Sequence, residues 1–362
     1  MTPDMTTDQR APATACRTCG EPALSRDRFC EQCGTPTSTT PIPPIPRTST
    51  AHQGPPTKAT PTPALAPTPA LAPAAGRVVC GDCGGVAVGA DGFCGRCGLR
   101  QTGGPGGGEV DLGDVGAAVS DRGLRRKRNE DAVAIAELSR GACAVVCDGV
   151  ATAPGSQEGA RRAADAALAV LTGRVSVGMD PRAATRAAVE RAAEVVAGLA
   201  RGPDASPACT FASAIVDPAG VTVGWVGDSR AYWLSEAGSR LLTRDDSWAA
   251  AMVEQGAMAA EDAWADPRAH MITAWLGADA GPVEPHVAAF RPAVPGLVVL
   301  CSDGLWNDLP EAADLAAVAL GGAGGPIGAA RRLLRAALEA GGRDNVTAAV
   351  IPCPPPVGER SR

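Results

Sequence analysis

Aspartates recur at the ends of apolar, strand-like runs along the C-terminal two-thirds of this 362-residue chain. Each lies in a short motif, most often beside a glycine, where a strand gives way to a loop. They are Asp131, Asp148, Asp228, Asp303 and Asp344. Carboxylates at strand ends, with few histidines near them, suit hard cations such as Mg²⁺ or Mn²⁺, which prefer oxygen ligands. The pattern predicts phosphoryl transfer or hydrolysis, where a metal pair supplies a hydroxide and neutralises phosphate charge.

Eight of the 13 cysteines form four Cys-x-x-Cys-Gly units in the N-terminal third. The first pair of units comprises Cys16, Cys19, Cys30 and Cys33, and the second pair comprises Cys80, Cys83, Cys94 and Cys97. A Cys-x-x-Cys turn points two thiolates at one ion, and the glycine after it tolerates a positive φ. We therefore predict two structural Zn²⁺ ions, each held by four thiolates in a small ribbon that needs the metal to fold.

Composition divides the chain into segments. We predict a first zinc ribbon at 14–35, a Pro/Thr/Ala-rich linker without a fold at 36–77 and a second ribbon at 78–100, followed by a Gly-rich linker at 101–109, a globular domain at 110–352 and a tail at 353–362. The linker is expected to be extended, because its prolines favour the polyproline II conformation.

Strand and helix patterns begin at about residue 110. Strand-like runs include 142–147, 210–216, 221–226, 297–301 and 346–351, and helical stretches include 158–171, 180–199, 246–255 and 327–340. The helices come in pairs between groups of strands, and Gly220 marks a hairpin within one group. This order predicts an α+β fold with antiparallel sheets covered by helices, not a doubly wound parallel sheet.

Charge and hydropathy exclude two classes of protein. The net charge of −6 gives the chain no basic character of the kind that nucleic-acid-binding domains show. No apolar run approaches the ~20 residues that a membrane span requires. The polar N-terminus lacks the apolar core of a signal peptide, so the expected location is cytoplasmic, and the paired cysteines are expected to bind metal and not to form disulfides.

Several motifs follow one another in a fixed order through the globular domain. They include Asn129-Glu130-Asp131, Cys147-Asp148-Gly149, Gly227-Asp228-Ser229-Arg230, Ser302-Asp303-Gly304 and Asp344-Asn345-Val346. With them, the segment from Val115 to Ile351 resembles the metal-dependent protein phosphatase 2C family of serine/threonine phosphatases, in its bacterial form. The resemblance implies a four-layer α-β-β-α sandwich, with two antiparallel sheets flanked by helix pairs, preceded here by the two zinc ribbons.

The resemblance also implies a metal centre. Asp148 would bridge two Mn²⁺ or Mg²⁺ ions, and the carbonyl of Gly149 would complete the coordination of the second ion. Asp303 and Asp344 would hold the first ion. Asp228, together with Asp303, would hold a third and weaker ion. A hydroxide shared by the two ions would attack phosphorus in line, without a covalent enzyme intermediate.

Further roles follow from the same resemblance. Asp131, with Glu130 beside it, would order metal-bound waters, and Asn345 would support the ligands from behind. Arg126 occupies the phosphate-gripping position, which suits a planar guanidinium that can bind two phosphate oxygens. Asp246 stands where the family often has a histidine, and we expect it to be a surface or cap residue. Residues 252–271 resemble the family's flap over the active-site cleft.

The chain departs from the bacterial pattern directly after Gly149, where Met-Gly-Gly-His is usual. Val150-Ala151-Thr152-Ala153-Pro154-Gly155 stands there instead. Loss of glycines restricts the backbone, so we expect a rebuilt loop that alters metal affinity or substrate approach. Val150 cannot act as an acid, which leaves protonation of the departing alkoxide to a metal-bound water.

The predicted function is dephosphorylation of phosphoserine and phosphothreonine proteins, opposing a serine/threonine kinase, with the ribbons tethering the enzyme to a protein partner. The alternative is a catalytically weak phosphatase-like scaffold or phosphopeptide-binding module. Nucleic-acid binding by the ribbons is disfavoured, because neither ribbon has a dense basic patch or interleaved aromatic residues. No membrane partner is expected.

Overall fold

The computed structural model describes residues 13–15, 22–24, 107–202, 205–281 and 283–354. Strands β1 (Ala13–Ala15) and β2 (Pro22–Leu24) form a short antiparallel pair. The eight cysteines predicted to bind zinc lie outside the described residues: Cys16, Cys19, Cys30, Cys33, Cys80, Cys83, Cys94 and Cys97. Both ribbons and the Pro-rich linker therefore stay predictions.

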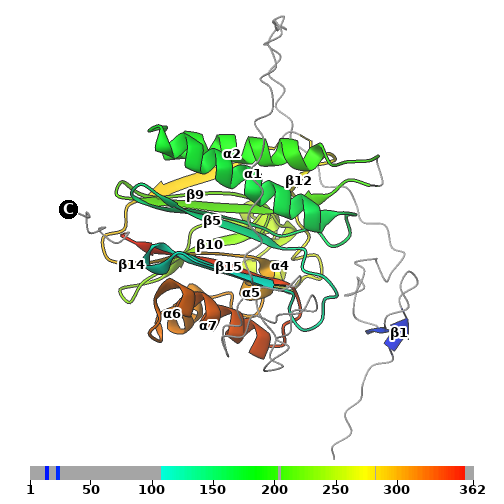
Figure 1. Cartoon of the computed structure of the whole chain (residues 1–362). Helices are drawn as coiled ribbons and strands as arrows, with labels where there is room; N and C mark the ends of the chain where they lie inside the picture. Colours follow the sequence, from blue (N-terminus) through cyan, green and yellow to red (C-terminus); the bar gives the residue numbers. More distant parts are fainter. Residues whose placement is uncertain (1–12, 16–21, 25–106, 203–204, 282, 355–362) are drawn as a thin grey trace, which may run out of the picture.

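Two antiparallel sheets lie face to face in the centre of the fold (Figure 1). The six-stranded sheet has the order β11 (Arg240–Leu241), β10 (Arg230–Leu234), β14 (Gly296–Cys301), β15 (Val346–Cys353), β4 (Ala117–Asp121) and β3 (Gly107–Asp111). The five-stranded sheet has the order β13 (His286–Phe290), β9 (Gly220–Val226), β8 (Phe211–Asp217), β6 (Gly141–Cys147) and β5 (Ala132–Leu138). Two shorter strands, β7 (Ala208–Cys209) and β12 (Leu276–Gly277), pair beside them.

Helices cover the outer face of each sheet. Helices α1 (Ser156–Ser176) and α2 (Pro181–Ala197) lie on the five-stranded sheet, and α5 (Asp303–Trp306), α6 (Ala312–Leu320) and α7 (Gly325–Glu339) lie on the six-stranded sheet (Figure 1). A single-turn 3₁₀ helix, Gly113–Val115, precedes β4. This arrangement confirms the predicted antiparallel α+β architecture with helices on both outer faces.

The sequence explains why α1 and α2 pack closely. Alanines at helical spacing, such as Ala160, Ala163 and Ala167 of α1, are completely buried against the sheet and its neighbouring helix. Such small side chains let the helix backbones approach their neighbours closely. Many weak dispersion contacts then stabilise the packing in place of contacts between a few large side chains. Asp180 begins α2, because its carboxylate accepts a hydrogen bond from the Ala183 amide at 3.1 Å and Pro181 follows it.

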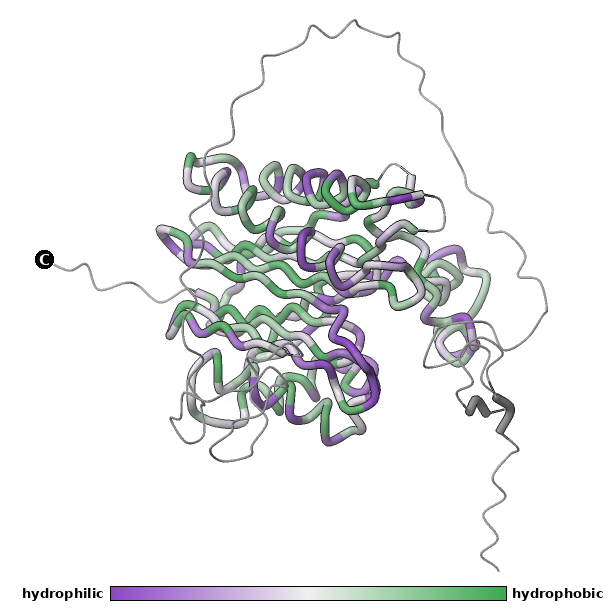
Figure 2. The backbone as a smooth tube through the Cα atoms, turned by 45° about the vertical axis from the view of Figure 1, so that its right-hand side comes forward, coloured by the Kyte–Doolittle hydropathy of each residue, from purple (hydrophilic) through white to green (hydrophobic). Residues whose placement is uncertain are grey.

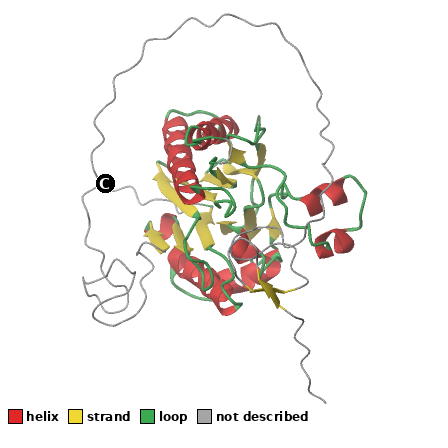
Figure 3. Ribbon diagram, turned by 90° about the vertical axis from the view of Figure 1, so that its right-hand side faces the viewer, coloured by secondary structure: helices red, strands yellow, loops and turns green. Residues whose placement is uncertain are grey.

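Between the sheets lies a second apolar layer. Val146, Val223, Val298 and Ile351 are buried there, and the strands of both sheets are coloured mostly as hydrophobic in Figure 2. Helices α3 (Trp248–Glu254) and α4 (Ala260–Ala265) form a small unit of their own with a separate apolar cluster, set apart from the sheets in Figure 3. None of the helices in the described ranges has the length and apolar character to span a bilayer.

Candidate active site

Strand register brings the motif aspartates to one end of the sandwich. In the five-stranded sheet, Ala132 pairs with Cys147, so Asp131 and Asp148 extend from adjacent strand ends. In the six-stranded sheet, Cys301 pairs with Ala348, so Asp303 and Asp344 also lie at one edge. The other end of β15 leads toward the C-terminus, at the left of Figure 1.

Electrostatics show that these carboxylates lie close together. Burial and then repulsion by Asp131, Asp303, Asp344 and Asp228 raise the pKa of Asp148 well above the ordinary carboxyl range. Burial, followed by Asp344 and Asp228, does the same to the pKa of Asp303. At both Asp148 and Asp303 the neighbouring aspartates add to the effect of burial on the pKa, as expected of carboxylates that share one small volume.

Two of the aspartates are almost completely inaccessible. Burial raises the pKa of both Asp131 and Asp228 to about 7. Hydrogen bonds from Ser302 and Thr347 partly offset this effect at Asp131, whereas Asp245 adds repulsion at Asp228. A cation beside these groups would remove the penalty for their negative charge.

The donor set fits a hard divalent cation. The Oδ2 atom of Asp131 is buried and has no hydrogen-bond partner within the described residues, so it is available as a ligand or as an acceptor from a bound water. At Gly149 a Cβ atom would lie 2.6 Å from the carbonyl oxygen of Glu130, so only glycine permits this close approach. Oxygen donors without histidine or thiolate favour Mg²⁺ or Mn²⁺ over Zn²⁺.

The described side chains do not converge on a common point as a preformed ligand set would. One of the predicted ligands is instead bound by a protein group: Arg126 donates a hydrogen bond from Nη2 to Asp344 Oδ2 at 2.5 Å. Burial would lower the pKa of Arg126, but Asp344 and then Asp303 and Asp148 outweigh it and raise that pKa. Arg126 therefore lies among the predicted ligands, with its guanidinium already committed to one of them.

Asn345 connects the loops that carry the site. Its Oδ1 accepts a hydrogen bond from the Glu130 amide at 2.7 Å, and its Nδ2 donates to the carbonyls of Arg122 and Arg128 at 2.9 and 2.8 Å. Both donors and one acceptor lone pair of the side-chain amide are thus used on the loop that carries Arg126. This placement agrees with a supporting position behind the carboxylates for Asn345 and Glu130.

Buried hydroxyls beneath the aspartates were not recognised from the sequence. Ser302 Oγ accepts from the Thr347 amide at 3.0 Å, and Thr347 Oγ1 lies 2.8 Å from Ser120 Oγ. Thr210 Oγ1 accepts from the Asp148 amide at 3.1 Å and lies 2.7 Å from Ser229 Oγ. The motifs already contain or adjoin four of these hydroxyl residues: Ser120, Thr210, Ser229 and Ser302. Their position at strand ends beside the aspartates was the sequence signal that could have identified them as supporting residues.

The unusual loop after Gly149 is closed by one hydroxyl. Ser156 Oγ donates to the Val150 and Ala153 carbonyls at 2.7 and 2.6 Å, and the Val150 amide bonds to the Ala208 carbonyl at 2.9 Å. The loop is therefore rebuilt as a compact turn that leads directly into α1.

Asp246 is not the surface or cap residue that the sequence suggested. Its Oδ2 accepts from the Gly227 amide at 2.9 Å, and its Oδ1 lies 2.8 Å from His286 Nε2. Gly227 has φ +96°, and it precedes the buried Asp228. His286 also stacks on Trp225 with ring centroids 4.9 Å apart. Asp246 and His286 together hold the turn that places Asp228.

His286→Phe is expected to destabilise the fold by about 0.5–1 kcal/mol at pH 6 and by less at pH 9. The hydrogen bond that His286 donates to the Asp246 carboxylate raises the pKa of His286, against the smaller effect of burial. The stabilisation is therefore full below the unfolded-state pKa of about 6.5 and is lost as the pH rises through the raised folded-state pKa. Urea denaturation at both pH values measures the difference.

His270→Phe is the matched control. Burial, followed by repulsion from Arg230, lowers the pKa of His270, so this substitution should become relatively more favourable as the pH falls. A loss in His286→Phe that is the same at pH 6 and pH 9 would show that the ionised pair with Asp246 is not what stabilises this turn.

The segment predicted to be a flap comprises the end of α3, helix α4 and the residues after it. His270 lies between Trp264 of α4 and Trp306 of α5, with ring centroids 5.9 Å apart for Trp264–His270 and 5.7 Å apart for His270–Trp306. The Arg230 guanidinium lies 3.6 Å from the centre of the Trp306 ring and pairs with Asp245 at 2.8 Å. This aromatic stack links the segment to the helix that begins at Asp303.

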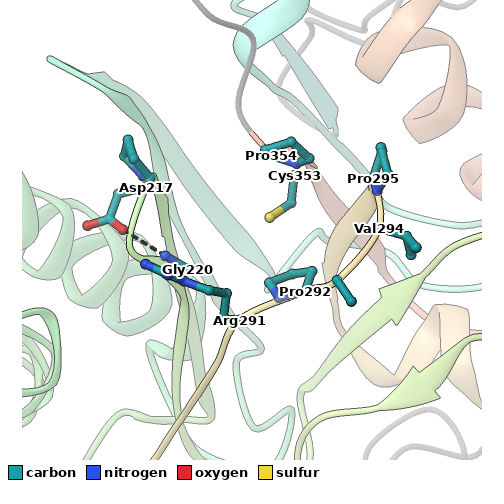
Figure 4. Close-up of a pocket in the computed structure, with 10 residues that line it drawn as sticks. Asp217, Gly220, Arg291, Pro292, Val294, Pro295, Cys353 and Pro354 are labelled. Carbon is teal, nitrogen blue, oxygen red and sulfur yellow. Dashed lines mark hydrogen bonds between the residues drawn. The ribbon is translucent and has the colours of Figure 1, made fainter.

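A cavity of about 340 Å³ lies at the opposite end of the sandwich (Figure 4). It is lined by the β8–β9 turn at Asp217 and Gly220, the connection from Arg291 to Pro295, and the end of β15 at Cys353. None of the motif aspartates lines it. The cavity is therefore separate from the candidate active site.

The two antiparallel sheets, with buried carboxylates gathered at one end, define a candidate metal-dependent hydrolase. The chain belongs to the protein phosphatase 2C family, whose model matches residues 116–320. This confirms the resemblance noted from the motifs.

Relatives of known structure agree with this assignment. The serine/threonine protein phosphatase PstP of Mycobacterium tuberculosis is 32% identical over 237 residues, which are 65% of this chain and 44% of PstP. The PPM Ser-Thr phosphatase MsPP of Mycobacterium smegmatis, crystallised with cacodylate, has 28% identity and a TM-score of 0.54, covering 65% of this chain and 97% of that one. The PstP catalytic domain in complex with two manganese ions gives 28% identity, a TM-score of 0.54 and coverage of 65% and 96%. The chain spans less than half the length of the curated relative PstP.

Proposed function

We propose that this protein is a metal-dependent serine/threonine protein phosphatase. The observation that carries the proposal is the gathering of Asp131, Asp148, Asp303 and Asp344 at one end of the sandwich, where burial, followed by repulsion from neighbouring aspartates, raises the pKa of Asp131, Asp148 and Asp303. Clustered buried carboxylates are costly unless a cation neutralises them. Membership of the protein phosphatase 2C family and the two manganese ions in the PstP catalytic domain support the same conclusion.

Each side chain has a proposed role. Asp148, the Gly149 carbonyl, Asp303 and Asp344 would hold two Mn²⁺ or Mg²⁺ ions, and a third would lie at Asp228 with Asp303. Bound there, such ions supply an activated water and neutralise developing charge.

The remaining residues would position substrate and solvent. Arg126 would bind phosphate oxygens through its planar guanidinium, exchanging its present partner Asp344 for the substrate. Asp131, with Glu130, would accept hydrogen bonds from the attacking water and orient it. Asn345 holds the Arg126 loop in register, as its three hydrogen bonds indicate. No histidine occurs at position 150, so the departing alkoxide would be protonated by solvent.

We also propose that residues 110–352 form the catalytic domain, and that the N-terminal cysteines bind two structural Zn²⁺ ions. We further propose that these ribbons tether the enzyme to a protein partner. The phosphoprotein substrate would be a kinase or one of the substrates of that kinase.

The test is hydrolysis of a phosphothreonine peptide by the full chain in Mn²⁺, in Mg²⁺ and in EDTA, beside Asp303→Ala. The matched control is Asp314→Ala, which removes an exposed carboxylate from α6. We expect Mn²⁺-dependent release of phosphate that Asp303→Ala abolishes and Asp314→Ala preserves. Binding of Mn²⁺ and of phosphopeptide without hydrolysis would instead establish the binding-module alternative.

A further inference from the structure

The loop between β4 and β5 is the most basic segment near the site. Residues 122–128, here called the basic loop, have the sequence Arg-Gly-Leu-Arg-Arg-Lys-Arg, in a chain whose net charge is −6. The loop leaves the six-stranded sheet at Asp121 and enters the five-stranded sheet at Ala132. It therefore crosses the end of the sandwich where the aspartates gather.

The basic loop is held at both ends. Asn345 Nδ2 donates to the carbonyls of Arg122 and Arg128, which are the first and last residues of the loop. The Leu124 amide also bonds to the Gly342 carbonyl at 2.8 Å. A loop tied to the segment that carries Asp344 has a fixed position relative to the site, so its charges are preorganised for a ligand.

Two of the basic side chains are exposed and uncommitted. Arg126 pairs with Asp344, and Arg128 acts on Glu130, whose pKa it helps to lower against the larger effect of burial. Arg125 and Lys127 are exposed, and their side chains form no ion pair or hydrogen bond within the described ranges. On the outer helices, by contrast, Arg161 pairs with Glu158.

Their positions match the residues beside a phosphorylated side chain. Arg125 and Lys127 flank Arg126, and consecutive Cα atoms lie ~3.8 Å apart. An extended peptide advances by ~3.3–3.6 Å per residue, so residues one to three places from the phosphorylated residue lie about 4–10 Å from it. Long arginine and lysine side chains beside the phosphate-binding residue can reach that zone.

We propose that the basic loop selects phosphopeptides with acidic residues next to the phosphorylated serine or threonine. This inference rests on the proposed phosphatase function and names a substrate class for it. Arg125 and Lys127 are the specificity-determining residues, attracting carboxylates on the peptide, while Arg126 binds the phosphate itself. Opposite charges in such an exposed setting act mainly on encounter and ground-state binding, so the selectivity belongs in KM.

A peptide accounts for the loop better than a nucleic acid does. The loop contains no aromatic residue on which a base could stack. The basic charge is also confined to a few residues around one phosphate-sized site. A nucleic-acid-binding surface instead follows the phosphate backbone of its ligand with many basic side chains.

The test compares three phosphothreonine peptides, with acidic, neutral or basic flanks, as substrates of the full chain with Mn²⁺. The variants are Arg125→Glu/Lys127→Glu and, as matched control, Arg140→Glu. Arg140 is exposed in the turn at the other end of the β5–β6 hairpin, so it changes the net charge without altering the basic loop. We expect about tenfold preference for the acidic over the neutral peptide, expressed in KM and reduced by 0.5 M NaCl. Arg125→Glu/Lys127→Glu should abolish or invert this preference, while Arg140→Glu should keep it.

The outcomes separate the two proposals. Equal kcat/KM for all three peptides, or the same preference in Arg125→Glu/Lys127→Glu, would overturn the inference and leave the phosphatase function intact. Hydrolysis of none of them would refute the phosphatase function instead. A single-stranded RNA that binds with micromolar or tighter affinity, and loses it in Arg125→Glu/Lys127→Glu but not in Arg140→Glu, would assign the loop to nucleic acid and also overturn the inference.

Discussion

Asp148→Asn is expected to lower kcat/KM on a phosphothreonine peptide by ~10³-fold or more. The substitution preserves shape and removes one negative charge from the group that every other site aspartate acts upon. Weaker retention of a metal pair forfeits several kcal/mol of transition-state stabilisation, and each 1.36 kcal/mol is about tenfold in rate. Phosphate release and calorimetric titration with Mn²⁺ measure the two losses together.

The same substitution should stabilise the metal-free protein. Because the folded-state pKa of Asp148 is raised, the folded state holds a proton that the unfolded state releases above about pH 4, so stability falls as the pH rises toward the raised pKa. Asparagine carries no such cost. In EDTA at pH 7.5, Asp148→Asn should therefore melt at a higher temperature than the wild type, and it should gain less from added Mn²⁺. A variant that melts lower in EDTA, or gains as much from Mn²⁺, would contradict this role.

Arg126→Ala is expected to reduce kcat/KM by ~10²-fold while Mn²⁺ binds at least as tightly as before. The loss follows from a missing charge-assisted contact to phosphate. The retained or improved metal affinity follows from the pair between Arg126 and Asp344, in which the guanidinium competes with a cation for the same carboxylate. Steady-state kinetics and Mn²⁺ titration of the full chain give both quantities.

Arg126→Lys separates charge from geometry. Lysine restores the positive charge but not the planar fork, so only part of the lost activity should return. If Arg126→Ala weakened Mn²⁺ binding as strongly as Asp148→Asn does, Arg126 would be a scaffold for the carboxylates and not a phosphate ligand.

Local patterns predicted most of the fold, because the spacing of apolar residues that marks a helix or a strand can be recognised within a few neighbouring residues. The run 180–199 corresponds to α2 at Pro181–Ala197, and 297–301 corresponds to β14 at Gly296–Cys301. The site aspartates were predictable for the same reason: each directly follows or precedes a recognisable strand, and antiparallel register brings those ends together.

Long-range partners could not be predicted in this way. Asp246 was misjudged because its partner His286 is 40 residues away in sequence, and only the fold brings β13 beside β9. The hydrogen bond between Ser302 and Thr347 spans 45 residues. A hydroxyl in a motif shows no sign of which carboxylate it will support, since that depends on how two sheets pack.

The distribution of the aspartates between the two sheets has a mechanical consequence. Asp131 and Asp148 adjoin strands of the five-stranded sheet, and Asp303 and Asp344 adjoin strands of the six-stranded sheet, whereas Asp228 lies between β9 of the first sheet and β10 of the second. Ions shared between these groups would act as a reversible cross-link between the two sheets at the open edge of the sandwich. Pulling the layers apart would then require expelling the ions first, so metal supply would govern resistance to proteolysis and to force as well as turnover.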